Sequence, residues 1–134
     1  WIVDNKRTCF LPVVQQREHR NSLLFADFNG ATQLVDNRFG IAEPVVKRSK
    51  LTKARELDMV LLPLVGFDNE GNRIGMGGGF YETTFEYLKS GDQDKPLLVG
   101  VAHEIQKVGG IDAESWDIPL SIVVTDRKIY RLGD

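Results

Sequence analysis

The chain has 134 residues, of which 42% are hydrophobic and 27% charged, and its formal net charge is −2. This length and composition predict one domain with a real hydrophobic core, and the near-balanced charge argues against a general nucleic-acid-binding surface. A single cysteine, Cys9, cannot form an internal disulfide and is expected to be a small buried hydrophobe. No apolar stretch approaches the length of a transmembrane helix. We therefore expect a cytoplasmic protein with no nucleic-acid or membrane partner.

The first half of the chain predicts short extended segments joined by polar connections. Trp1-Ile2-Val3 is expected to be the last turn of a helix. Strands are expected over residues 7–14, 23–28 and 33–35. Polar or irregular connections are expected over residues 15–21, at Asn29-Gly30 and over residues 37–44. Residues 45–57 carry five Lys or Arg and predict a solvated segment with one helical turn from Thr52.

The second half of the chain predicts a strand–helix–strand arrangement. Residues 59–62 are apolar without alternation, which predicts a strand buried on both faces. Apolar residues at helical spacing over residues 81–88 predict a helix that stops at Gly91. Further strands are expected over residues 97–102, 122–125 and 128–132. This order favours a parallel sheet with helices on its faces.

The stretch that organises the chain is residues 67–82, which contain five of the 13 glycines. Glycine has no Cβ, so such a loop lets backbone N–H groups approach a ligand closely. The helix expected after the loop would direct its free N–H groups and positive dipole end toward an anion. Arg73 adds a permanent charge whose fork fits phosphate oxygens. The stretch therefore predicts a phosphate site.

The glycine pattern taken alone leaves a second interpretation open, because glycine-rich loops are often flexible connections. No lysine follows Gly79, so the stretch does not match the phosphate-loop motif G-x-x-x-x-G-K-[ST]. Phe80 occupies the last position of G-x-G-x-x-G, so the dinucleotide fingerprint also fails. Standard nucleotide motifs therefore do not decide between the two interpretations.

The whole stretch resembles the signature of the 5-formyltetrahydrofolate cyclo-ligase family. The resemblance rests on residues 63–68 and 73–81, on Asn37 to Pro44, and on Trp116-Asp117-Ile118-Pro119-Leu120 with Val123-Val124-Thr125. It implies ATP- and Mg²⁺-dependent conversion of 5-formyltetrahydrofolate to 5,10-methenyltetrahydrofolate, with the formyl oxygen phosphorylated before ring closure. It also implies an α/β domain with three layers and a largely parallel central sheet, of NagB/RpiA/CoA-transferase-like type.

The resemblance also implies roles for individual residues. Arg73 is the catalytic residue that it implies. The residues implied to hold ATP are Arg73, Ile74, Gly75, Met76, Gly77, Gly78, Gly79, Phe80 and Tyr81. Those implied to contact the folate are Met76, Gly77, Gly78, Gly79, Phe80 and Phe39. Glu82 is the implied Mg²⁺ residue, where the family usually has Asp.

Several of these residues have a second, structural interpretation. Phe80 and Tyr81 either line the pterin site or form the core face of a helix. Glu82 either orients the metal or serves the helix dipole alone. A second family carboxylate falls at Ser121 here, which places metal ligation in question. Phe39 is either a folate contact or a core plug.

Other polar residues remain open at this point. His103 follows a predicted strand and is either a structural or a catalytic histidine. Glu43 could position the loop around it. The basic residues between Lys47 and Arg55 either attract a polyglutamate tail or form a solvated face.

The resemblance further implies that family members begin earlier, with basic residues that reach the ATP phosphates, so we expect an N-terminally incomplete single domain. A polypeptide that starts at Trp1 is accordingly expected to form little or no methenyltetrahydrofolate. Two rival functions are a catalytically silent relative that binds nucleotide or folate, and a nucleotide-independent enzyme like a CoA-transferase or a sugar-phosphate isomerase. A silent relative need not retain the loop from Arg73 to Tyr81 followed by an acid.

Overall fold

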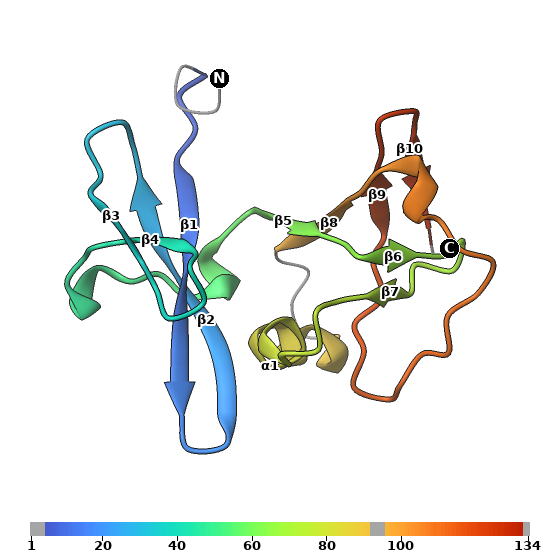
Figure 1. Ribbon diagram of the computed structural model, residues 1–134, viewed down its shortest axis with the longest axis horizontal. Coiled ribbons are helices and arrows are strands. Elements are labelled where there is room, and N and C mark those ends of the chain that lie inside the picture. The colour runs from blue at the N-terminus through green and yellow to red at the C-terminus, as the bar shows by residue number, and fades with distance from the viewer. Residues whose placement is uncertain (1–4, 92–95, 133–134) are drawn as a thin grey trace. The chain divides into compact units, whose positions relative to one another are not determined.

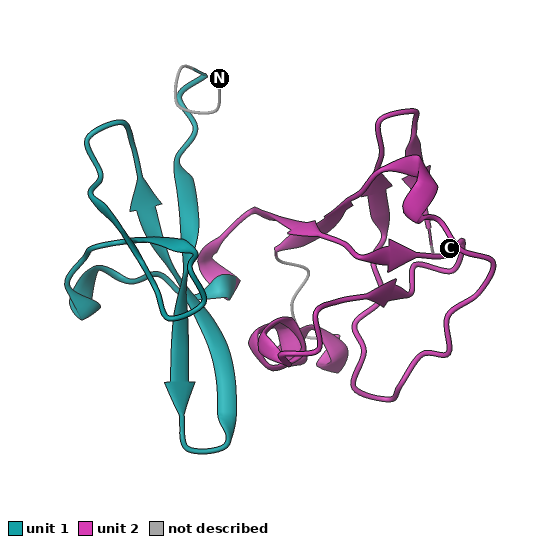
Figure 2. Ribbon diagram, in the orientation of Figure 1, with its two compact units in different colours: residues 1–54 teal, residues 55–134 magenta. Residues whose placement is uncertain are grey.

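The computed structural model describes residues 5–91 and 96–132 (Figure 1). Contacts between residues divide the chain into two compact units, residues 1–54 and residues 55–134 (Figure 2). Each unit is described below by itself. The helical turn predicted at Trp1-Ile2-Val3 lies outside the described residues, and the prediction of a single domain stays a prediction.

Unit 1 is built on a long β-hairpin. Strands β1 (Cys9–Arg17) and β2 (Arg20–Phe28) pair antiparallel along their full length (Figure 1). The polar loop predicted over residues 15–21 is wrong, because most of it continues the two strands. Only Glu18 and His19 turn the chain, with His19 at φ 63°. Polar residues are accommodated in these strand ends since the ends are solvent-exposed.

A second, shorter hairpin follows the turn at Asn29-Gly30, where Thr32 N–H donates to Asn29 O at 3.0 Å. Strands β3 (Leu34–Asp36) and β4 (Ala42–Pro44) form it, so the segment predicted as irregular is partly a strand. Glu43 Oε1 accepts hydrogen bonds from Val14 N–H and Asn37 Nδ2, both at 2.8 Å. Glu43 therefore ties β1 to the short hairpin, which is a structural role.

The basic segment around the boundary between units 1 and 2 contains two short 3-10 helices, η1 (Arg48–Lys50) and η2 (Ala54–Glu56). The prediction of one helical turn near Thr52 is confirmed in outline. Between them, Thr52 exchanges two backbone hydrogen bonds with Phe25, at 2.9 and 2.7 Å. The segment is thus held against β2, while its Lys and Arg side chains remain in solvent.

Unit 2 is built on a four-stranded sheet in the order β10-β9-β8-β5. Strands β5 (Met59–Pro63), β8 (Leu97–Val101) and β9 (Ile122–Val124) are parallel to one another. Strand β10 (Ile129–Arg131) closes the edge antiparallel to β9 (Figure 1). The predicted strands and the largely parallel sheet are confirmed.

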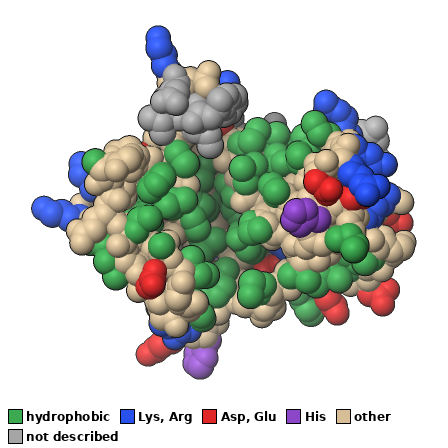
Figure 3. Space-filling model, turned by 45° about the horizontal axis from the view of Figure 1, so that its top comes forward, with side chains coloured by type: hydrophobic (Ala, Val, Ile, Leu, Met, Phe, Trp, Pro, Cys, Tyr) green, Lys and Arg blue, Asp and Glu red, His purple; other side chains and the backbone are tan. Residues whose placement is uncertain are grey.

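The burial of the parallel strands differs from the prediction. Along β5, side chains alternate between exposed and buried, with Met59 and Leu61 54% and 56% exposed and Leu62 1% exposed. The packed face belongs to the core of unit 2, in which Phe67 and Phe85 are also fully buried. The other face keeps apolar side chains in solvent, and Figure 3 shows hydrophobic side chains on the molecular surface. A continuous apolar run therefore did not specify burial on both faces.

Two further elements of unit 2 flank the glycine loop at residues 75–79. A small hairpin of β6 (Gly66–Phe67) and β7 (Arg73–Ile74) precedes it. The helix α1 (Phe80–Phe85) follows it and continues as the 3-10 helix η3 (Glu86–Ser90), which ends at Gly91 as predicted. Among the described residues, no helix is long and apolar enough to cross a membrane.

Candidate functional site: the glycine loop of unit 2

The turn between β6 and β7 is fixed by one buried carboxylate. Asp68 is 2% exposed. Its Oδ1 accepts hydrogen bonds from Glu70 N–H at 2.9 Å and Asn72 N–H at 3.0 Å. Its Oδ2 accepts from Asn72 Nδ2 and from Ile111 N–H, both at 3.0 Å. Burial disfavours the charged carboxylate, yet these hydrogen bonds together lower the pKa of Asp68 below its ordinary value.

Gly71 fixes the same turn against a distant segment. Its φ is +88°, and a Cβ added there would lie 2.4 Å from the backbone oxygen of Leu120. Leu120 N–H donates to Gly71 O at 2.9 Å. Only glycine permits this close approach of two backbones. The turn therefore delivers β7 in a defined position.

Arg73, the first residue of β7, points into the protein. Its side chain is 6% exposed, and its Nη2 lies 2.7 Å from Glu82 Oε1. Its guanidinium carbon lies 5.7 Å from the centre of the Tyr81 ring. Among the described residues, Arg73 Nε is a buried donor without a hydrogen-bond partner. A buried cation with an unused donor is suited to an incoming anion.

The loop from Gly75 to Gly79 lies at the surface, and Met76 is 96% exposed. Gly77 and Gly79 have φ of +75° and +69°, and no atom lies within 4 Å of a Cβ added at either. These two glycines therefore serve the backbone conformation and not close packing. Space of this kind leaves the backbone accessible to a ligand.

The helix α1 is shorter than the sequence predicts, with six α-helical residues. Tyr81 stacks on Phe85 with ring centres 6.4 Å apart, and Phe85 is fully buried. Burial raises the pKa of Tyr81, an effect that the Arg73 charge opposes and Glu82 adds to. Phe80 and Tyr81 are half-buried, so each contributes to the core and also presents a surface beside the loop. A helix this short adds little dipole, which leaves Arg73 and the loop backbone as the main anion-binding groups.

Glu82 lies in the first turn of α1, with its side chain 23% exposed and Oε1 held by Arg73. Mg²⁺ often takes one or two protein carboxylates and completes its shell with water and phosphate oxygens. A single accessible carboxylate beside the loop fits that requirement. No group of three or more His, Cys, Asp or Glu side chains that could hold a metal occurs within residues 5–91 and 96–132. Asp117 caps a turn instead, where Glu114 N–H donates to its Oδ2 at 2.8 Å.

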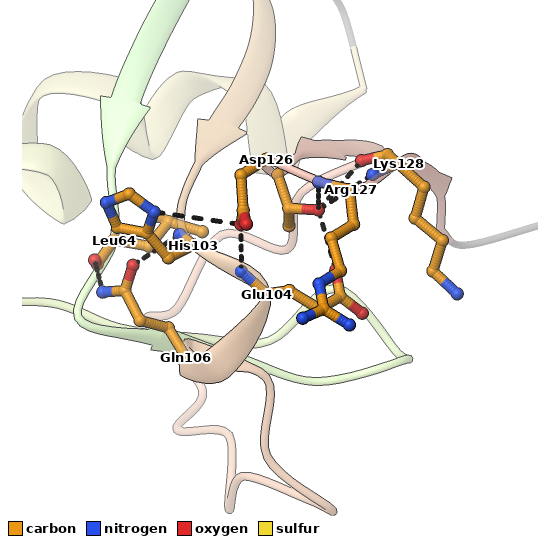
Figure 4. Close-up of polar contacts among 8 residues, drawn as sticks. Leu64, His103, Glu104, Gln106, Asp126, Arg127 and Lys128 are labelled. Carbon is orange, nitrogen blue, oxygen red and sulfur yellow. Dashed lines mark hydrogen bonds and ion pairs between the residues drawn. The ribbon is translucent and has the colours of Figure 1, made fainter.

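A polar cluster follows β8 and β9, at the carboxyl ends of the parallel strands (Figure 4). Asp126 Oδ1 accepts from Glu104 N–H at 2.7 Å and lies 3.8 Å from His103 Nδ1. Glu104 accepts hydrogen bonds from the hydroxyls of Tyr130 and Thr125, which lower the pKa of its carboxyl. The side chain of His103 is 78% exposed, so it is not a buried structural histidine.

Gln106 connects this cluster to the hairpin that leads into the glycine loop. It belongs to the 3-10 helix η4 (Glu104–Gln106), and its Oε1 accepts from His103 N–H at 2.6 Å. Its Nε2 donates to Leu64 O at 2.6 Å (Figure 4). The same Nε2 also donates to Val65 O at 3.0 Å. Val65 N–H in turn donates to Ile74 O at 3.0 Å. Gln106 therefore braces the segment that carries β7.

The structure brings together most of the residues predicted for the site, because residues 73–82 form one continuous loop and helix start. Phe39 belongs to unit 1, in the turn before β4, and the two units are described separately. The Phe39 ring is 50% exposed, with Arg38 stacked 4.6 Å from its centre. Phe39 is therefore not a core plug.

Two residues that position the site were missed by the sequence analysis. Asp68 could have been found from the turn composition Asp-Asn-Glu-Gly-Asn, since an aspartate that begins a turn often accepts nearby backbone N–H groups. Gln106 carries no such signal, because its partners at Leu64 and Val65 lie about forty residues away in the sequence.

The fold and the loop define an α/β protein with a parallel core sheet and a glycine loop bounded by a buried arginine. The chain belongs to the 5-formyltetrahydrofolate cyclo-ligase family, whose model matches residues 1–126. It is similar to the 5-formyltetrahydrofolate cyclo-ligase of Escherichia coli K12, with 40% identity over 90% of this chain and 64% of the relative. The Haemophilus influenzae cyclo-ligase is 38% identical over 85% of this chain and 59% of the relative.

Solved structures agree with this family. An NMR structure of Aquifex aeolicus 5,10-methenyltetrahydrofolate synthetase matches with a TM-score of 0.73 and 32% identity, over 98% of this chain and 62% of that chain. The synthetase from Mycoplasma pneumoniae matches with a TM-score of 0.62 at 22% identity, which supports the fold alone. The chain spans less than two thirds of the length of the relatives described here.

Proposed function

We propose that this protein converts 5-formyltetrahydrofolate to 5,10-methenyltetrahydrofolate in a reaction that depends on ATP and Mg²⁺. Membership of the cyclo-ligase family supports the reaction class. The observation that carries the proposal is the open loop from Gly75 to Gly79, bounded by the buried Arg73 and by Glu82.

The phosphate side of the proposed site is the loop itself. ATP is proposed to contact Arg73 and the residues that follow it, namely Ile74, Gly75, Met76, Gly77, Gly78, Gly79, Phe80 and Tyr81. Arg73 is the proposed catalytic residue, because a buried guanidinium with a free donor stabilises charge that develops on oxygen. Glu82 is proposed to orient Mg²⁺. When bound, ATP supplies the phosphoryl group that makes the formyl oxygen a leaving group, and Mg²⁺ offsets phosphate charge.

The folate side is proposed to include Met76, Gly77, Gly78, Gly79, Phe80 and Phe39. Met76, in unit 2, is almost fully exposed and offers apolar surface that a pterin ring could cover. Phe39, in unit 1, is half exposed, and its role as a folate contact is proposed from the family resemblance. Covering these side chains would also exclude water from the reacting oxygen, which favours phosphoryl transfer over hydrolysis.

The remaining parts of the proposal concern the whole molecule. We propose that the chain forms one domain of the three-layer, NagB/RpiA/CoA-transferase-like type, and that it acts in the cytoplasm on a small-molecule substrate. The parallel arrangement of β5, β8 and β9 supports the fold.

The test is the absorbance of the methenyl product formed from 5-formyltetrahydrofolate, ATP and Mg²⁺. The Arg73→Lys variant keeps the charge but loses the planar fork, and we expect kcat to fall about tenfold or more. Arg131→Lys on the exposed edge strand is the matched control and should leave turnover unchanged. The proposal is wrong if the folded full-length protein forms no product, and the role of Arg73 is wrong if Arg73→Lys turns over substrate as fast as wild type.

A further inference from the structure

The two charged residues of the site sit at the two ends of the glycine loop and are joined to each other. Arg73 Nη2 and Glu82 Oε1 lie 2.7 Å apart, although eight residues separate them in the sequence. Their ion pair therefore closes the base of the loop. Within the described part of the chain, Arg73 Nε is buried without a hydrogen-bond partner, so this cation is only partly satisfied.

The pair leaves the unliganded loop without a free charge of either sign. The Arg73 side chain is only 6% exposed, and that of Glu82 is 23% exposed. At such sites removal of one charge leaves the other buried and uncompensated, which is strongly unfavourable. A phosphate that binds Arg73 leaves the Glu82 carboxylate without its compensating cation. A metal cation that binds Glu82 likewise leaves Arg73 without its compensating anion.

We propose that the Arg73–Glu82 ion pair is an exchange switch that couples the binding of phosphate to the binding of a divalent cation. When both arrive, the phosphate replaces Glu82 at Arg73 and the cation replaces Arg73 at Glu82, so that both buried charges stay compensated. Neither ligand alone satisfies both residues. This inference rests on the proposed function, because it assumes that the loop receives a triphosphate.

The switch makes a specific demand on Glu82. In the metal-free protein its carboxylate competes with phosphate for Arg73, so it opposes binding of the bare triphosphate. In the presence of the cation the same carboxylate supports binding. The ratio of the triphosphate dissociation constants without and with metal therefore reports the coupling. A carboxylate that served only the helix dipole would contribute a similar amount under both conditions.

The experiment is calorimetric titration of the protein with inorganic triphosphate, first with EDTA and then with excess Mg²⁺. For Glu82→Gln we expect the metal-free affinity to rise about tenfold or more, since Arg73 loses its competing charged partner. The ratio of the two dissociation constants should fall by a similar factor. Glu82→Asp keeps the charge on a shorter side chain and should retain most of the wild-type ratio. Glu86→Gln removes one charge from the next turn and should change the ratio by less than about twofold.

Three outcomes decide the proposal. A reduced ratio in Glu82→Gln with a retained ratio in Glu82→Asp supports the switch. An unchanged ratio in a folded Glu82→Gln protein overturns the switch while leaving the proposed function intact. If wild type binds no triphosphate with or without Mg²⁺, both the switch and the proposed nucleotide site are wrong. Circular dichroism of each variant verifies folding, and Glu82→Ala, which also removes the charge, supplies the same comparison if Glu82→Gln does not fold.

Discussion

The turn at residues 68–72 and the loop at residues 75–79 lie on either side of the short strand β7, and they use glycine for opposite reasons. Gly71 is required because the backbone of Leu120 occupies the place where a Cβ would be. Gly77 has nothing within 4 Å of its added Cβ, but it also has a positive φ. Glycine in the turn therefore permits close packing of two backbones, whereas glycine in the loop permits a left-handed conformation in which the backbone stays accessible.

The polar groups of the two regions differ in the same way. In the turn, Asp68 accepts hydrogen bonds with both carboxylate oxygens, and the network ends there. At the loop, within residues 5–91 and 96–132, Arg73 is paired with Glu82 and has a buried Nε without a partner. A satisfied network stabilises the fold, whereas an incompletely satisfied one is typical of a site that awaits a ligand. Substitutions in the turn should therefore affect stability, and those in the loop should affect binding.

The largest expected effect is that of Gly71→Ala. The new Cβ would overlap the Leu120 oxygen, and alanine disfavours the positive φ at this position. We expect the free energy of unfolding to fall by about 4 kcal/mol, measured by urea denaturation. Gly110→Ala is the control, since nothing lies within 4 Å of its added Cβ and its φ is not positive. A loss below about 1 kcal/mol in Gly71→Ala would contradict the packing role of the turn.

A somewhat smaller loss is expected for Asp68→Asn. The asparagine NH₂ would face N–H groups that now donate hydrogen bonds to the carboxylate. We therefore expect the free energy of unfolding to fall by about 3 kcal/mol at neutral pH. Because the folded pKa of Asp68 is lowered, its contribution is complete above the ordinary carboxyl range near pH ~4 and is lost as pH falls through the folded pKa. The difference between wild type and Asp68→Asn should therefore shrink in acid.

Glu70→Gln supplies the control for this pH dependence, because Glu70 lies in the same turn with an exposed side chain. Its unfolding curves should follow those of wild type at each pH. A stability difference between wild type and Asp68→Asn that stays constant from neutral pH into strong acid would show that the charge of Asp68 is unimportant.

The smallest effect on stability is expected for the loop, in Gly77→Ala. The added Cβ of alanine would have no atom of the described residues within 4 Å, so the only cost is that of holding alanine in the left-handed conformation. That cost should lower the free energy of unfolding by about 1 kcal/mol. Gly75→Ala is the matched control, because its φ is not positive and its Cβ would meet only Arg73 Nη1, at 3.8 Å. If Gly77→Ala destabilises the protein as much as Gly71→Ala, the distinction between the two regions fails.

The sequence predicted the strands of the parallel sheet well, since each is a local apolar pattern. The strands predicted over residues 59–62, 97–102 and 122–125 correspond within one residue to β5, β8 and β9, and Gly91 ends the helical segment as expected. The exposure of Met59 and Leu61 was not predictable from the sequence. An apolar run shows that a strand is compatible with burial, but it does not show which face of the strand is covered. The predicted strands of the hairpin over residues 9–28 stop short of its turn, because the polar residues at that end resemble a loop.

The site was predictable where it is continuous in sequence and unpredictable where it is assembled from distant segments. Arg73 and Glu82 flank one loop, so both were identified, but their ion pair depends on the backbone path between them. The support from Gln106 and from Leu120 comes from segments more than thirty residues away, and no local pattern announces it. Tertiary contacts of this kind require the structure.

The most direct test of the account is to map the amide chemical shifts of the protein as ATP and Mg²⁺ are added. We predict the largest changes at Gly75 to Gly79 and at the neighbouring Arg73 and Tyr81, because their backbone or side chains are proposed to contact the phosphates. The turn at Asp68 should remain unperturbed by comparison. Changes concentrated in the polar cluster around His103, or no changes at saturating nucleotide, would contradict the central claim that the glycine loop is the phosphate site.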